Sequence, residues 1–169
     1  MIKKTVQILS KPLVVFLVLG LVLGSVVSSQ ADTKFTPKIK QAMAEMKNDC
    51  AKLGPAKVDG GNLLFGTTKI NDNFALVDSL KAKYNCTATF FVKKGDAFMR
   101  VSTNVMKDGK RAVGTPLDPS GPAIAAIRQG KAHHGIVDIL GKMYDTGYEP
   151  IKNAAGETVG VYYIGFPLE

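Results

Sequence analysis

Hydrophobic residues along the chain fall into stretches with different spacing, and each spacing predicts a different element. Residues 12–27 form a nearly unbroken apolar run. Across Pro37–Leu53, apolar residues recur at steps of three and four, which is typical of an amphipathic helix. Thr36 is the expected N-cap, and Gly54 followed by Pro55 ends the pattern. The stripe that should face the core consists of Ile39, Ala42, Met43, Met46, Cys50 and Leu53.

The rest of the chain predicts a short hairpin, a second helix and then an antiparallel sheet. The hairpin turns at Asp59-Gly60-Gly61, and the helix runs from Asn71 or Asp72 to about Tyr84. From Cys86 the hydrophobic period shortens to two, which indicates strands. The expected strands and one short helix are "CTATFFV", "AFMRVSTNVM", "RAVGT", the helix "PAIAAIRQG", and strands near 134–140, 142–152 and 157–166. This order predicts an α+β fold with five to six antiparallel strands, a long N-terminal helix and short inserted helices.

The apolar run near the N-terminus predicts export from the cytoplasm. Lys3, Lys4 and Lys11 give it a basic start, and Ser29-Gln30-Ala31 has the small residues of a signal-peptidase site. The sixteen residues of the run would span about 24 Å as a helix, short of the roughly 30 Å bilayer core. We therefore expect cleavage after Ala31, with an uncleaved inner-membrane anchor as the alternative. Residues 32–169 then form one periplasmic or secreted domain.

The charge distribution does not favour nucleic acid as a partner. The chain carries a formal net charge of +8, and removal of residues 1–31 leaves +5, because three lysines and no acidic residue are lost. The remaining lysines and arginines are spread among acidic residues and turns. A mild positive excess favours anionic ligands. A hydrophobic fraction of 46% with 21% charged residues excludes a disordered chain.

Cys50 and Cys86 are the two cysteines of the chain, and an extracytoplasmic location permits a disulfide between them. Two buried free thiols are the alternative. Neither cysteine belongs to a CxxC or CxxCH motif, so redox and covalent haem sites are not expected. His133 and His134 are neighbours whose side chains should point apart on a strand, so we expect no metal and no other cofactor. The sequence also lacks the common catalytic motifs GxSxG, HExxH and GxxxxGK, and we expect no enzyme.

Two stretches in the second half of the chain resemble the single-Cache sensor domains of bacterial chemoreceptors and histidine kinases. They are "KDGKRAVGTPLD" and "GIVDILGKMYDTGYEPIKNAAGETVGVYYIGFP", and they extend over most of the region from about Phe98 to Pro167. The strongest part is Tyr144, Tyr148-Glu149-Pro150-Ile151, Gly156, Val159-Gly160 and Gly165. The variety that the chain resembles is the Cache 3/Cache 2 fusion type, and the long first helix fits the same family.

The resemblance implies a PAS-like sheet with a small-molecule pocket on one face. Family members bind organic acids, amino acids or other small metabolites outside the membrane, and the bound state is sensed. In receptors a membrane helix follows the last strand, but no residue follows Glu169 here. The expectation is therefore a standalone sensor that signals through a separate membrane receptor, for example in chemotaxis. The domain could also form a homodimer through the first helix.

The resemblance also directs attention to five side chains that could contact such a ligand. Strand alternation predicts that Arg100, Ser102 and Asn104 share one face, where a guanidinium could clamp a carboxylate. A solvated strand arginine is the alternative. Tyr144 and Tyr148 share a face of a later strand and could form pocket walls, or they could simply pack in the core. The alternative function is an interaction or structural module without a pocket, in which Arg100 would lie on open sheet surface.

Overall fold

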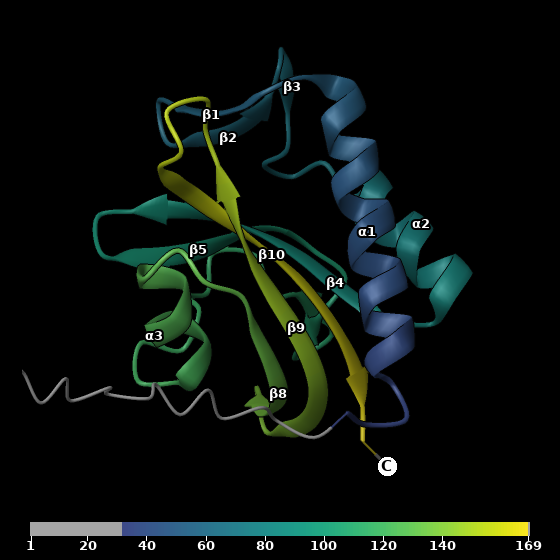
Figure 1. Ribbon diagram of the computed structural model, residues 1–169. Helices are drawn as coiled ribbons and strands as arrows, with labels where there is room; N and C mark the ends of the chain where they lie inside the picture. The colour runs from purple at the N-terminus through teal and green to yellow at the C-terminus, as the bar shows by residue number, and fades with distance from the viewer. Residues whose placement is uncertain (1–31, 169) are drawn as a thin grey trace, which may run out of the picture.

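A five-stranded antiparallel sheet forms the middle of the protein in the computed structural model, which describes residues 32–168 (Figure 1). The strand order is β5-β4-β10-β9-β8, and two small sheets, β1-β2-β3 and β6-β7, flank it. The elements are α1 (Thr36–Leu53), β1 (Ala56–Asp59), β2 (Asn62–Phe65), β3 (Thr68–Lys69), α2 (Ala75–Tyr84), β4 (Thr87–Lys94), β5 (Ala97–Thr103), β6 (Met106–Lys107), β7 (Lys110–Arg111), α3 (Pro122–Arg128), β8 (His133–Ile139), β9 (Lys142–Lys152) and β10 (Thr158–Pro167). The predicted α+β fold class is confirmed.

The predicted signal segment, residues 1–31, lies outside the described residues. None of the helices between residues 32 and 168 has the length and hydrophobicity that a membrane span requires.

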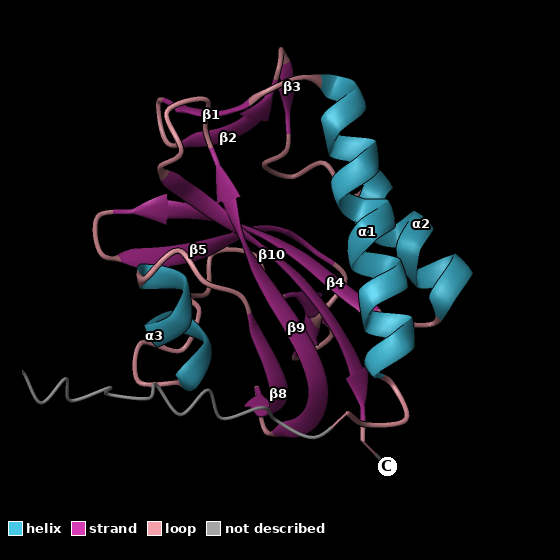
Figure 2. Ribbon diagram, in the orientation of Figure 1, coloured by secondary structure: helices cyan, strands magenta, loops and turns pink. Residues whose placement is uncertain are grey.

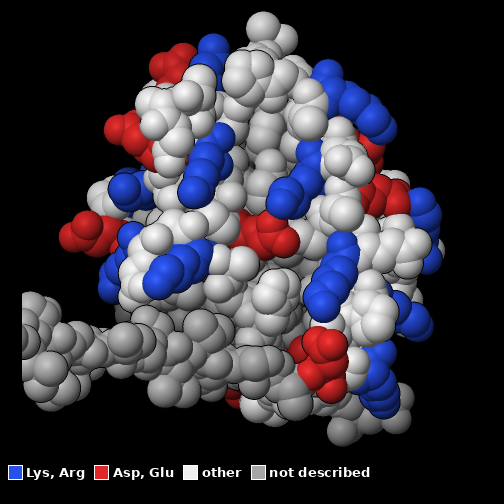
Figure 3. Space-filling model, in the orientation of Figure 1, with Lys and Arg blue, Asp and Glu red and all other residues white. Residues whose placement is uncertain are grey.

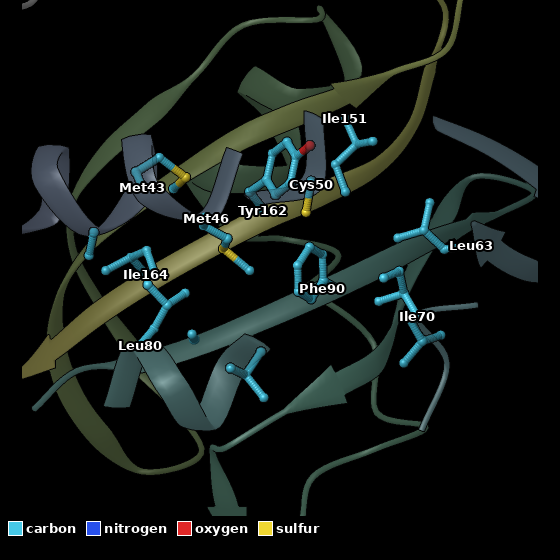
Figure 4. Packing of buried hydrophobic residues seen from close by; sticks show 14 of the residues in the cluster. Met43, Met46, Cys50, Leu63, Ile70, Leu80, Phe90, Ile151, Tyr162 and Ile164 are labelled. Atoms are coloured by element: carbon cyan, nitrogen blue, oxygen red, sulfur yellow. The ribbon is translucent and has the colours of Figure 1, made fainter. Parts of the chain in front are cut away.

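Helices α1 and α2 cover one face of the sheet and α3 covers the other (Figures 1 and 2). The α1 stripe packs on β10 and β9, and Met43 and Met46 lie close to Ile164 and Tyr162 of β10 (Figure 4). Every predicted stripe residue is buried except Leu53, which is 37% exposed at the C-terminal end of the helix. The apolar residues around α3 form a second, separate cluster on the opposite face.

The predicted N-cap at Thr36 was wrong. Phe35 occupies the cap position, and no side chain caps the helix. The Thr36 hydroxyl instead accepts a hydrogen bond from the Thr33 backbone N–H at 2.8 Å, so the residue lies in the first turn. The Phe35 ring stacks on Phe166 of β10 with centroids 5.0 Å apart, and this contact anchors the start of α1 to the end of the last strand.

The predicted disulfide is replaced by two separate buried thiols. Cys50 lies beside Tyr162 (Figure 4). The Cys86 thiol instead approaches the Leu80 carbonyl oxygen at 3.6 Å. Thr87, the residue after Cys86, pairs with Gly165 of β10. Cys86 therefore lies at the level of Phe166, four residues from Tyr162 along β10 or about 13 Å, whereas a disulfide requires Cα atoms within roughly 7 Å.

Gly160 and Gly165 of β10 are positions where a side chain has no room. A Cβ on Gly160 would collide with the backbone carbonyl oxygen of Phe91 on β4. A Cβ on Gly165 would collide with the Tyr163 hydroxyl, which lies over the glycine and bonds to the Thr87 hydroxyl at 2.9 Å. The glycines therefore allow β10 to pair closely with β4 and to bury the Tyr163 phenol.

We expect Met46→Ala to lower the free energy of unfolding by about 2–5 kcal/mol. Met46 is fully buried between α1 and the sheet, so truncation leaves a cavity as well as removing apolar contacts. Met106→Ala is the matched control, because Met106 is 52% exposed and its truncation should cost less than about 0.5 kcal/mol. Urea unfolding of both variants measures the difference, and equal losses would contradict the packing described for α1.

We also expect both cysteines to be present as thiols. Burial raises the pKa of Cys50 to about 12 and that of Cys86 to about 11, so little thiolate forms near neutral pH in the folded protein. Alkylation without reductant should add no group to the folded protein and two groups in denaturant, as read by intact mass. An unmodified mass in denaturant would instead indicate a disulfide.

Candidate functional site

A cavity of about 600 Å³ opens on the α3 face of the sheet. Its walls come from β5, the β8–β9 hairpin, the segment 115–118 and the start of α3. The lining residues are Arg100, Lys107, Thr115, Pro116, Leu117, Asp118, Gly121, Pro122, Ala123, Ile136, Val137, Asp138, Ile139, Leu140, Met143 and Tyr148. This volume lies within the range of roughly 300–1,000 Å³ that is usual for small-molecule sites.

Arg100 is the buried charged group of this cavity, with a side chain only 6% exposed. The segment 114–117 runs along β5 beside it, held by hydrogen bonds between the Arg100 backbone and Thr115 (2.9 Å) and Gly114 (2.9 Å). The guanidinium Nη1 donates to the Thr115 hydroxyl at 2.6 Å and to the Pro116 carbonyl at 3.2 Å. Its Cζ lies 5.0 Å from the centre of the Phe91 ring. The side chain is therefore fixed by two neutral acceptors and one aromatic face.

No described carboxylate forms an ion pair with Arg100, and its Nε is buried without a hydrogen-bond acceptor. Burial lowers the pKa of the guanidinium from its usual value, although an arginine remains protonated at neutral pH. A charge removed from water without a counter-ion is unfavourable. An anion that entered the cavity would supply the missing partner.

Ser102 and Asn104 do not share a face with Arg100, and the predicted alternation was wrong here. Phe91 pairs with Arg100 but Phe90 pairs with Ser102, so Val101 is an extra residue in a β-bulge. The bulge turns the following side chains toward α2. The Ser102 hydroxyl donates to the Asn73 carbonyl at 2.7 Å, just before α2.

Asn104 connects β4 to α2 through two buried hydrogen bonds. Its side-chain carbonyl accepts from the Ala88 N–H at 2.8 Å, and its amide nitrogen donates to the Val77 carbonyl at 2.6 Å. The side chain is 4% exposed. Both of its polar atoms are therefore engaged within the protein, on the face opposite the cavity.

Tyr148 lines the cavity and Tyr144 does not. Tyr148 is 2% exposed, and its ring centroid lies 4.9 Å from that of Tyr163. Burial raises the pKa of the Tyr148 phenol well above its ordinary value, so the hydroxyl is neutral and can donate a hydrogen bond. Tyr144 packs at the margin of the same apolar cluster. The structure thus brings Arg100 and Tyr148 together out of the five predicted residues.

His133 and His134 line a different cavity of about 470 Å³, near the start of α1. Burial lowers the pKa of His133, whose ring lies 6.2 Å from Tyr148. Within residues 32–168 no group of three or more histidine, cysteine, aspartate or glutamate side chains gathers in a way that could hold a metal ion.

The face that Figure 3 shows carries basic and acidic residues side by side. Lysine and arginine side chains are scattered over it, with aspartate and glutamate between them, and they do not merge into one basic patch. Among the described residues, ion pairs such as Lys47–Glu149 and Arg111–Asp78 join basic and acidic side chains.

Comparison with known proteins shows the family of this chain. The Cache 3/Cache 2 fusion domain family matches residues 25–169. The chain belongs to this family. The sensor domain of Escherichia coli DcuS is a similar solved structure, with 16% identity, a TM-score of 0.44 and coverage of 75% of this chain and 91% of that one. A proposed transcriptional regulator from Rhodococcus sp. RHA1 has 15% identity, a TM-score of 0.42 and coverage of 71% of each chain. No curated protein matches the sequence significantly.

The exposed rim of this Cache domain's cavity was not among the predicted site residues. Ile136, Leu140 and Met143 of the β8–β9 hairpin are 48%, 41% and 46% exposed and line the opening. A signal was present in the sequence "GIVDILGKM", because hairpin tips are usually polar and this one carries Leu140 and Met143 on either side of its glycine.

We expect Asn104→Ala to destabilise the Cache domain by about 2–4 kcal/mol without affecting a ligand of the Arg100 cavity. The substitution leaves the Ala88 N–H buried without its side-chain acceptor, at about 1–3 kcal/mol, and removes the hydrogen bond to the Val77 carbonyl, at about 1 kcal/mol. Ser102→Ala removes a single bond and should cost about 1 kcal/mol. Urea unfolding and a binding titration on the same samples check this, and loss of affinity in Asn104→Ala at a temperature where it is folded would contradict the assignment.

Proposed function

We propose that this Cache domain is an extracytoplasmic sensor module that binds a small carboxylate, an organic acid or an amino acid, with Arg100 as the anion clamp. The observation that carries the proposal is the Arg100 guanidinium, which is buried on a cavity wall without an acidic partner. A carboxylate offers two acceptor oxygens that match the parallel N–H groups of a guanidinium. Family membership supports the sensor role.

The surroundings of Arg100 favour such a complex. Nη1 is occupied by Thr115 and Pro116, whereas Nε has no acceptor, so the guanidinium retains unused donors. Tyr148, on β9, lines the same cavity, and its neutral hydroxyl can donate to a carboxylate oxygen. The clamp also holds the segment 114–117, so a ligand on Arg100 would act directly on the loop that borders the cavity.

The position of Arg100 favours binding over the alternative of a pocketless interaction module. In that alternative Arg100 would be solvated on open sheet, but its side chain is buried and borders a cavity. The basic start and apolar run of residues 1–31 support an extracytoplasmic location. Contact with a separate membrane receptor and pairing of two copies through α1 stay predictions from the sequence.

The test is a thermal-shift titration of the purified protein with acetate, succinate, hexanoate and leucine, beside the neutral amides acetamide and hexanamide. A ligand at a hundred times its Kd stabilises by about 2.7 kcal/mol, which raises the Tm by roughly 10 °C in a domain of this size. We expect a shift with at least one carboxylate and none with its amide.

Substitutions of Arg100 test whether the rise in Tm depends on its guanidinium. Arg100→Met should abolish it and Arg100→Lys should weaken it, because lysine keeps the charge but not the fork. Arg128→Met is the matched control, since Arg128 is exposed at the end of α3 and outside the cavity, and it should retain the full shift. A carboxylate shift that survives in folded Arg100→Met, or equal shifts with acid and amide, would overturn the clamp.

A further inference from the structure

The two edges of the central sheet differ in how their backbone groups are paired. On the β5 edge, the Arg100 N–H donates to the Thr115 carbonyl at 2.9 Å and the Leu117 N–H donates to the Phe98 carbonyl at 2.8 Å. At the other end of the sheet β8 pairs with β9, and within residues 32–168 no backbone group bonds to its outer edge. An open edge strand of this kind is a template for pairing with another chain.

Three residues of β8 direct their backbone groups toward this outer edge. In an antiparallel sheet the N–H and C=O groups of successive residues point alternately to the two neighbouring strands. The Met143 carbonyl of β9 accepts from the Leu168 N–H, on the β10 side, and Met143 is paired with Asp138 of β8. The backbone groups of Asp138 therefore point away from β9, and by alternation those of Ile136 and His134 do so as well.

The side chains of these three residues point to the α1 face of the sheet and remain exposed. Ile136 pairs with Asp145 of β9, and Asp145 pairs with Phe166, which belongs to the cluster under α1. Ile136 is 48% exposed, and His134 and Asp138 are exposed on either side of it. Although Ile136 borders the cavity described above, its side chain thus lies on the opposite face of the sheet from the clamp.

The outer edge of β8 is complementary to itself. When a second copy lies antiparallel to β8 with a two-fold axis at Ile136, the two Ile136 side chains meet and each His134 faces Asp138 of the copy. An imidazole N–H can donate to a carboxylate, and the half-exposed isoleucines lose apolar surface to each other. The residues that face one another are also those with free N–H and C=O groups, so they can form hydrogen-bonded pairs. A shift of two residues would lose both the charge match and the apolar contact.

We propose that two copies of this domain associate through their β8 edges and join their sheets into one continuous antiparallel sheet. The charge match across the axis makes a second copy the fitting partner. The side of α1 that is left in solvent is mostly polar, since its apolar stripe is buried on the sheet, so α1 is the less favourable surface for pairing. The inference concerns an interface and does not depend on which ligand the cavity binds.

Sedimentation equilibrium of the purified protein tests the association, and we expect the mass to rise toward that of a dimer with concentration. Ile136→Lys places two lysines opposite each other at the axis, so the dimer Kd should increase about ten-fold or more. Because Ile136 is half-exposed, the variant should fold. Met106→Lys is the matched control, since Met106 is 52% exposed and lies on β6, and it should keep the Kd within two-fold.

Substitutions of His134 test the register of the two strands. His134→Glu places carboxylates opposite the Asp138 side chains and should weaken the dimer, whereas His134→Lys keeps opposite charges and should retain it. In addition, a short bismaleimide should link Ile136→Cys to its copy and should not link Met106→Cys, because the native cysteines are buried.

Three results would overturn the inference. The first is a monomer up to a protein concentration of about 1 mM. The second is a dimer whose Kd is unchanged in both Ile136→Lys and His134→Glu, which would indicate another surface such as α1. The third is equal cross-linking of the Ile136→Cys and Met106→Cys variants. None of these results bears on the carboxylate titration, so failure of the interface and failure of the proposed function are separate outcomes.

Discussion

The central strand β10 has to bury both of its faces at once, and the arrangement of the whole domain follows from this constraint. Its alternate residues Tyr162 and Ile164 meet the helices α1 and α2, while Val161 and Tyr163 meet the cluster around α3. A slip of one residue would exchange the two sets, so the register of β10 with β4 and β9 is strongly specified. Through β4, the same register sets the position of Phe91, on which the Arg100 guanidinium lies.

The bulge at Val101 makes the polar side chains on and just after β5 point to both faces of the sheet. Before the bulge, Arg100 points to the cavity face and meets Thr115 and Pro116. After it, Ser102 and Asn104 point to the opposite face and bind the backbone at and around α2. Because an extra residue reverses the alternation, one short strand both presents a cation to the cavity and attaches a helix to the other side of the sheet.

The difference between local and long-range information explains what the sequence could predict. The helix α1 and most strands from Cys86 onward were predictable, because hydrophobic spacing is a local property. The bulge was not, since strict alternation contains no sign of an extra residue. The predicted strand "RAVGT" was wrong, since only its first residue belongs to a strand, β7 (Lys110–Arg111). The predicted Cys50–Cys86 disulfide was wrong. How far apart the two cysteines lie follows from the pairing of β4 with β10, which is a long-range property that hydrophobic spacing does not reveal. Arg100 and Tyr148 were found by residue type, whereas the apolar hairpin tip was missed because exposed hydrophobic residues are common on protein surfaces.

A buried cation without a partner also supplies what a sensor needs. A ligand shifts a conformational equilibrium only by its difference in affinity for the two states. The segment 114–117 is tied to Arg100 by backbone and side-chain hydrogen bonds, so the position of this loop and the satisfaction of the charge are linked. The loop's neutral oxygens are the acceptors of the guanidinium in the structure. Under the proposed function, a carboxylate that took over the charge would change the balance of bonds that holds the loop, and the occupied cavity would then present a different surface.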